Sequence, residues 1–189
     1  MISAPVQLAW RLALLGVVVV LVQIAAVSQI EILGANADLT PLVVASAGLL
    51  AGSLPGAAFG FGIGLFLDLA LVQTVGMSSL LFLSIGYGAG RLRELRDPQG
   101  AAVPIAVGAA ATLLAQLGFS LMQFLLGRDV PLDIEIVWEL VVTVGLGALL
   151  ATPVHALVRR WLLPVLPEDP RRRRRRAYTT GGLSPLSRA

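Results

Sequence analysis

Asp68 is the only residue with a formal charge in a long apolar part of this sequence, residues 39–90. A carboxyl group in such surroundings must face protein or water, because exposing it to lipid costs about 2.5–3.5 kcal/mol or more. One interpretation makes Asp68 part of a substrate or proton path. The other makes it a structural group that is protonated, or that accepts hydrogen bonds from neighbours such as Thr74, Ser78 or Ser79. The structural interpretation is favoured, because one carboxyl group without an intramembrane basic partner makes a poor relay.

The other residues capable of chemistry lie near the ends of apolar segments. Glu135 and Glu139 flank Trp138 and could serve as an acid–base pair. Acidic residues also favour the positive end of a helix dipole, and tryptophan favours the membrane interface, so these residues are interpreted as a helix start. His155, the only histidine, is interpreted as a packed or interfacial residue. With no cysteine and no cluster of ligands or nucleophiles, the sequence predicts neither an enzyme nor a metal or cofactor site.

Three glycines precede Asp68 at a spacing of four residues: Gly56, Gly60 and Gly64. Four residues are close to one turn of an α-helix, so the glycines and Asp68 share one helical face. Because glycine has no side chain, that face lets the backbone of another helix approach closely. The three glycines are therefore predicted to form a helix-packing face, with Asp68 as an intramembrane polar group at its end.

The composition indicates a membrane protein. Of the 189 residues, 57% are hydrophobic and 13% are charged, and the mean hydropathy is +0.86. A soluble domain carries roughly 25% charged residues, so this chain has too few to cover a surface in water. The predicted fold class is therefore all-α, a polytopic membrane protein.

The apolar segments predict six short transmembrane helices. Their expected ranges are about residues 12–30, 40–53, 55–74, 77–90, 101–126 and 136–158. Residues 1–161 would form a six-helix transmembrane domain, and residues 162–189 a disordered, arginine-rich cytoplasmic tail. A cleaved signal peptide is disfavoured, because the first apolar stretch is long for that role and cleavage would leave an odd number of spans.

The arginines orient this arrangement. With six spans, one side of the membrane receives Arg11, Arg91, Arg93, Arg96, Arg159, Arg160 and the arginines of the tail. The other side receives Arg128 together with Glu31, Asp38, Asp129, Asp133 and Glu135. Short basic loops stay in the cytoplasm, so both termini are predicted to be cytoplasmic. The protein itself is predicted to lie in the cell inner (plasma) membrane.

The tail contains a run of six arginines: Arg171, Arg172, Arg173, Arg174, Arg175 and Arg176. A basic cluster next to a membrane attracts anionic lipid headgroups, by about 1 kcal/mol per residue. Such a run could also bind nucleic acid or an acidic partner. Contact with anionic lipid is preferred, and no nucleic-acid partner is expected.

The middle of the chain resembles the MreD family of bacterial rod shape-determining proteins. The likeness lies in residues 56–87, in the glycine-rich stretch ending at Asp68, then Gly76, then a helix with Gly86 and Tyr87 near its end. The order of segments is similar as far as Trp161. The resemblance implies a fold similar to the substrate-binding components of energy-coupling-factor transporters, and a non-catalytic role.

The same resemblance implies partners. Proteins of this family associate with MreC in the machinery that elongates the cell wall, together with the MreB filament, the RodA glycosyltransferase and a class B penicillin-binding protein. The expected function is a membrane scaffold that controls cell shape.

The alternative is the substrate-binding membrane subunit of a vitamin transporter, which would share the fold. Ala9 and Ala13 form the kind of small-residue pair with which such subunits dock a transmembrane coupling protein. A transporter subunit also needs a polar ligand pocket near the outer face. The polar residues available for it are Asp68, Gln73, Gln116 and Gln123.

Overall fold

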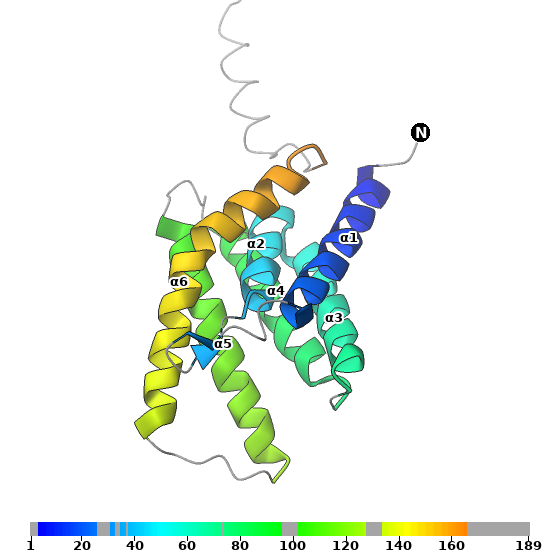
Figure 1. The fold of residues 1–189 in the computed structure, drawn as a ribbon. Coiled ribbons are helices and arrows are strands. Elements are labelled where there is room, and N and C mark those ends of the chain that lie inside the picture. The colour runs from blue at the N-terminus through cyan, green and yellow to red at the C-terminus, as the bar shows by residue number, and fades with distance from the viewer. Residues whose placement is uncertain are drawn as a thin grey trace, which may run out of the picture.

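The computed structural model describes residues 4–25, 31–32, 35–36, 38–72, 74–95, 102–127 and 134–165. Within these residues the chain forms six helices and one antiparallel pair of very short strands (Figure 1). The elements are α1 (Ala4–Ala25), β1 (Glu31–Ile32), β2 (Ala35–Asn36), α2 (Thr40–Ala51), α3 (Ser53–Ala70), α4 (Met77–Leu95), α5 (Ala102–Leu125) and α6 (Ile134–Leu162).

The prediction of an all-helical fold with six helices is confirmed for the described residues. α2 begins at Thr40 and α4 at Met77, as expected. α4 extends past residue 90 to Leu95. Oppositely charged side chains one turn apart stabilise a helix, and here Arg91 Nη1 lies 3.2 Å from Glu94 Oε2. The strands were not predicted, since two residues are too few to leave a periodic pattern.

In the described part of the chain, four helices are long and apolar enough to cross a membrane: Val6–Ala25, Ser53–Ala70, Ala102–Leu125 and Val137–Leu162. They indicate a membrane protein, which confirms the prediction made from the composition. α2 is apolar but has 12 residues, about 18 Å of helix against a hydrocarbon core of about 30 Å. α2 alone is therefore too short to cross the hydrocarbon core.

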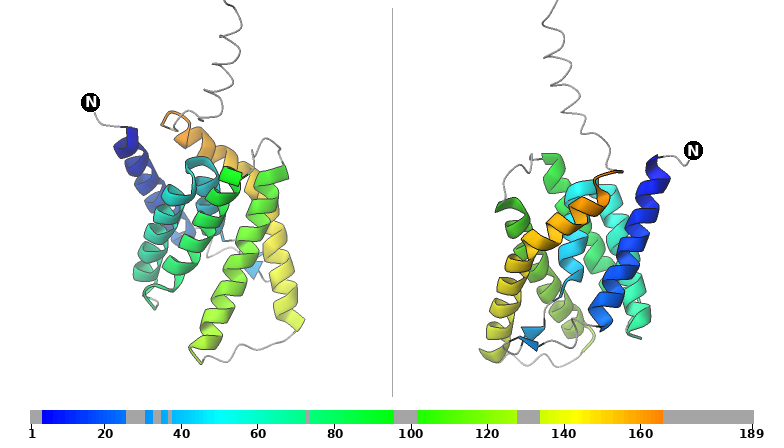
Figure 2. Two further views of the ribbon diagram at one scale, coloured as in Figure 1. Left: turned by 180° about the vertical axis from the view of Figure 1, so that it is seen from behind. Right: turned by 45° about the horizontal axis from the view of Figure 1, so that its top comes forward.

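α2 lies in the middle of the bundle and contacts all five other helices (Figures 1 and 2). Its residues from Thr40 to Leu49 are all buried. Leu42 faces Gly108 of α5, while Val44 faces Gly86 of α4. A helix that is apolar on every side is stable here because the other helices surround it.

The first and last helices meet at one end of the molecule (Figure 2). Arg11 of α1 donates a 2.8 Å hydrogen bond to the backbone carbonyl of Trp161 in α6, and the Trp161 indole N–H donates to the Arg11 carbonyl at 3.3 Å. The Arg11 guanidinium carbon lies 5.9 Å from the centre of the indole ring. At the same end, Arg93 of α4 donates to the carbonyl of Leu50 in α2.

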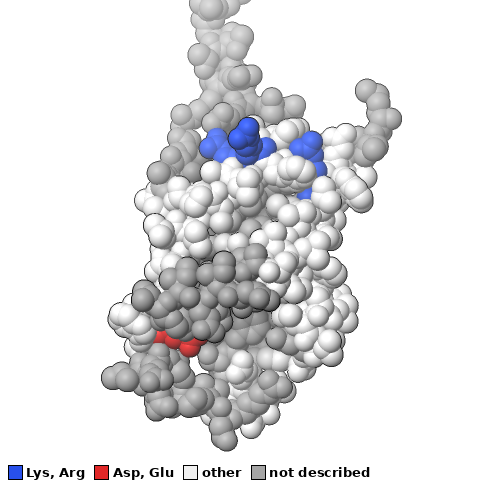
Figure 3. All heavy atoms as spheres, in the orientation of Figure 1, with Lys and Arg blue, Asp and Glu red and all other residues white. Residues whose placement is uncertain are grey.

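The arginines of the described residues gather at this end, called the arginine end below (Figure 3). They are Arg11, Arg91, Arg93, Arg159 and Arg160. In the same view, the visible acidic atoms lie toward the opposite end. Arg96, Arg128 and the tail arginines Arg171–Arg176 lie outside the described residues.

Candidate functional site

The glycines predicted to form a packing face lie between α3 and α4. Gly56, Gly60 and Gly64 are buried on α3. A side-chain carbon on Gly60 would lie 2.1 Å from the carbonyl oxygen of Phe82, and one on Gly64 would lie 2.4 Å from the amide nitrogen of Ser79. Two carbon atoms normally stay about 3.5–4.0 Å apart. α3 and α4 therefore touch backbone to backbone, and a larger residue at these positions would force them apart.

Glycines of α4 and α2 extend the same contact. A side-chain carbon on Gly86 would lie 2.2 Å from the carbonyl oxygen of Gly56, and one on Gly90 would lie 2.4 Å from the Cα of Ser53. In α2, a side-chain carbon on Gly48 would lie 2.4 Å from the carbonyl oxygen of Gly86. The three helices thus form one closely packed unit, the α2–α3–α4 unit, which van der Waals contact stabilises in lipid.

Asp68 lies at the far end of the glycine face and is fully buried. Its carboxylate accepts hydrogen bonds from the backbone N–H groups of Gly76 at 2.7 Å and Ser78 at 3.3 Å. These groups flank the start of α4, where backbone donors have no partner within the helix. The helix dipole also favours negative charge at this point. Asp68 therefore caps the helix that follows it.

Ser78, one of the neighbours expected to donate to Asp68, does so through its backbone N–H, whereas Gly76 was not expected as a donor. The hydroxyl oxygens of Ser78 and Ser79 are buried and have no hydrogen-bond partner among the described residues. Gly76 has a φ of 104°, a conformation that residues with side chains rarely adopt. This turn brings the start of α4 back to the carboxylate, and its geometry cannot be read from the spacing of polar residues.

A second carboxylate joins the same two helices at the arginine end. Glu94, near the end of α4, accepts hydrogen bonds from the Ser53 hydroxyl at 2.6 Å and the Ser53 N–H at 3.2 Å, at the start of α3. The bonds from Ser53, followed by the neighbouring Arg91, lower the pKa of Glu94 below its ordinary value. The sequence did not mark Glu94, because its partner lies 41 residues away.

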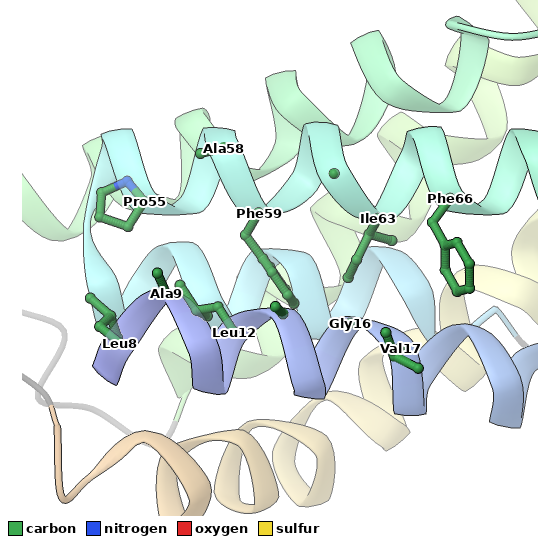
Figure 4. A pocket seen from close by; sticks show the side chains of 12 residues that line it. Leu8, Ala9, Leu12, Gly16, Val17, Pro55, Ala58, Phe59, Ile63 and Phe66 are labelled. Atoms are coloured by element: carbon green, nitrogen blue, oxygen red, sulfur yellow. The ribbon is translucent and has the colours of Figure 1, made fainter. Parts of the chain in front are cut away.

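A groove of about 530 Å³ lies between α1 and α3 (Figure 4). Its walls run from Leu8 to Val17 in α1 and from Pro55 to Phe66 in α3, and every lining residue is apolar. The pair Ala9 and Ala13 noted in the sequence lies in this wall. The α3 wall could not be predicted from the sequence, because the separation of two helices depends on tertiary packing.

The remaining candidate residues are not gathered into a site in the described residues. Glu139 and Trp138 are exposed on α6. The Nδ1 atom of His155 is buried and has no hydrogen-bond partner among the described residues. The side chains of Glu135 and Gln73 lie outside the described part of the chain. Within that part, no three His, Cys, Asp or Glu residues are placed to hold a metal ion.

No protein-family model, curated protein or solved structure matches this chain. An assignment of function therefore depends on the residues themselves and on the resemblance that they carry.

Proposed function

We propose that this chain is a non-catalytic membrane scaffold subunit of the bacterial cell-wall elongation complex, with MreC as its direct partner. The observation that carries the proposal is the position of Asp68. It is the only charged residue within residues 39–90, and both of its oxygens are bonded to the start of α4. The group best suited to intramembrane chemistry thus serves the fold, as expected of a protein that works by association.

The resemblance to the MreD family supports the choice of partners. MreB, RodA and a class B penicillin-binding protein would belong to the same assembly. In this proposal the chain spans the inner membrane six times, both termini are cytoplasmic, and the arginine end contacts anionic lipid at the cytoplasmic face.

The packing distinguishes a rigid inner unit from the apolar outer surface of the bundle. The α2–α3–α4 unit supplies a rigid frame, because backbone contacts leave its helices little freedom to shift. Large apolar side chains are exposed on α1, α5 and α6, among them Trp10 (69% exposed), Phe124 (68%) and Leu149 (72%). The outer faces of α3 and α4 also expose them, at Leu69 (59%) and Leu80 (56%). These outer surfaces are available to the helices of a partner, which associate in lipid through shape and van der Waals contact.

Affinity purification of the tagged full-length chain in mild detergent, followed by mass spectrometry, tests this function. We expect recovery of MreC together with wall-elongation enzymes. Recovery of a transmembrane coupling protein with paired ATPases would overturn the proposal and make the chain a vitamin-transporter subunit.

Two matched variants link the recovery to the described packing. Gly60→Leu should separate α3 from α4 and abolish the recovery of MreC, because the added side chain meets the backbone of Phe82. Gly88→Leu is the control, since no atom of the described residues outside the adjoining backbone of α4 lies within 4 Å of a side-chain carbon placed on Gly88. Equal recovery with both variants would show that MreC does not depend on the α2–α3–α4 unit.

A further inference from the structure

The groove between α1 and α3 is an apolar space that the helices of this chain leave unfilled (Figure 4). The two helices approach each other closely around Gly16, where a side-chain carbon would lie 3.1 Å from Ile63. At Gly62, also in the wall, no atom of the described residues outside the adjoining backbone of α3 lies within 4 Å of such a carbon. An empty space beside lipid forfeits van der Waals contact, so an apolar occupant is favoured. With about 530 Å³, the groove is within the range of roughly 300–1,000 Å³ typical of ligand sites.

The length of the groove matches one leaflet of a bilayer. At about 1.5 Å per residue, the wall from Leu8 to Val17 is about 14 Å long and the wall from Pro55 to Phe66 about 17 Å. Half of a hydrocarbon core measures about 15 Å. A lipid acyl chain ends near the middle of the bilayer, as this groove would. A transmembrane helix of a partner would continue through the other leaflet, where the groove offers it no wall.

Charge at the end of the molecule where the groove walls begin, at Leu8 and Pro55, favours an anionic headgroup. The guanidinium group of Arg11 is held against Trp161 of α6 and does not line the groove, so it acts as part of the net positive charge of that end. Beside the α3 wall, Arg91 pairs with Glu94, which is bonded to Ser53 just before Pro55. Glu94 is the only acidic residue among the described residues that lie with the five arginines of this end. Each arginine near the surface strengthens the attraction for an anionic lipid.

We propose that the groove between α1 and α3 holds one acyl chain of an anionic phospholipid, whose headgroup lies at the arginine end. The lipid would fill the gap between α1 and the α2–α3–α4 unit and so fix the position of α1. This binding site goes beyond the scaffold function and requires none of its partners, so it can be tested on the purified chain alone.

Native mass spectrometry of the full-length chain provides the test. The protein is reconstituted in bilayers with equal amounts of phosphatidylglycerol and phosphatidylcholine that carry the same acyl chains, and then released in mild detergent. We expect one phosphatidylglycerol molecule to remain on each protein, in several-fold preference to phosphatidylcholine. Gly62→Leu fills the groove and should lower that retention by about tenfold, because methylene contacts are lost.

Gly88→Leu is the matched control, because it adds the same side chain at an open glycine outside the groove and should retain the lipid. Ala58→Leu fills the groove from the same α3 wall and replaces Gly62→Leu if that variant does not fold.

Four results would overturn the proposal. The first is a wild-type protein that retains no lipid, and the second is equal retention by Gly62→Leu and Gly88→Leu. The third is equal retention of the two lipids by the wild type, which would contradict the anionic headgroup. The fourth is a lipid-free dimer that Gly62→Leu dissociates, since the groove would then be filled by a second copy of this chain.

Discussion

Asp68 accepts a 2.7 Å hydrogen bond from the backbone N–H of Gly76, so that the end of one helix caps the start of the next. Glu94 repeats this relationship in the opposite direction, because it accepts a 2.6 Å bond from the hydroxyl of Ser53 at the start of α3. The α3–α4 pair is thus closed at both ends by a carboxylate at a helix N-terminus, where the dipole favours negative charge. The two ends differ in exposure, since Asp68 is fully buried and the Glu94 side chain is 40% exposed.

Asp68→Asn should destabilise the fold by about 1–3 kcal/mol, the cost of one buried donor left without a partner. Gly76 and Ser78 donate to different oxygens of Asp68, and asparagine replaces one of these oxygens by an NH2 group, so one backbone N–H would face another donor. Asp68→Ala removes both acceptors and should cost more. The free energy of unfolding in detergent, measured with a denaturant, checks the order wild type, Asn, Ala.

The phenotype of the same variant separates the two interpretations of Asp68. Normal assembly and normal cell shape with Asp68→Asn would exclude a role for ionisation and leave hydrogen bonding as its function. A variant that assembles with its partners but loses function would instead indicate a substrate or proton path, and would contradict the scaffold proposal.

The order and number of the helices could be predicted because apolar segment length and helix-breaking residues are local properties of the chain. Thr40 and Met77 begin helices for that reason. The positions of Gly56, Gly60 and Gly64 on one face follow equally from the helical repeat. The partners of these glycines do not, because Phe82 and Ser79 reach them only after α4 turns back on α3.

The hydrogen bonds of the two capping carboxylates show the same limit. Whether Asp68 meets side chains or backbone depends on a positive φ at Gly76, and the bond between Glu94 and Ser53 joins residues 41 positions apart. The groove between α1 and α3 depends on the relative placement of two helices, which no periodicity within either helix encodes. Sequence patterns therefore locate the elements and their faces, while tertiary packing determines the contacts between them.

The side chains of Arg11 and Trp161 should be energetically coupled by about 0.5–1 kcal/mol through their cation–π contact. The two hydrogen bonds go to backbone carbonyls, which an alanine substitution keeps, so each is lost with its own donor side chain and adds nothing to the coupling. A double-mutant cycle with Arg11→Ala and Trp161→Ala, read from unfolding free energies, measures this coupling. Arg160→Ala combined with Trp161→Ala is a matched control on an exposed neighbour. A coupling of zero for Arg11 would show that the cation–π contact does not help to hold α1 and α6 together.

The contribution of Glu94 should depend on pH. Its pKa in the folded protein lies below the ordinary value of about 4.3, because the bonds from Ser53 and the charge of Arg91 favour the carboxylate. The stabilisation is therefore present above the unfolded-state pKa and is lost as the pH falls through the folded-state pKa. Melting temperatures between about pH 6 and pH 3 should fall more steeply for the wild type than for Glu94→Gln, which does not titrate.

Ser53→Ala provides the control for this titration, because it removes the hydroxyl bond and keeps the carboxylate. Its melting temperature should fall with pH less steeply than that of the wild type and more steeply than that of Glu94→Gln. Parallel curves for all three proteins would show that the Ser53 bonds do not stabilise the charged form.

Gly60→Ala and Gly88→Ala should change stability in opposite directions, although both add one methyl group to a helix. Alanine favours a helix over glycine by roughly 0.8–1.0 kcal/mol, and at Gly88 nothing opposes that gain. At Gly60 the methyl group would lie 2.1 Å from the Phe82 carbonyl oxygen, and the overpacking should cost about 1–3 kcal/mol or more. The midpoints of denaturant unfolding give the sign. Replacing Gly60 and Gly64 together with leucine should prevent assembly, and a normally assembled double variant would disprove the backbone contact between α3 and α4.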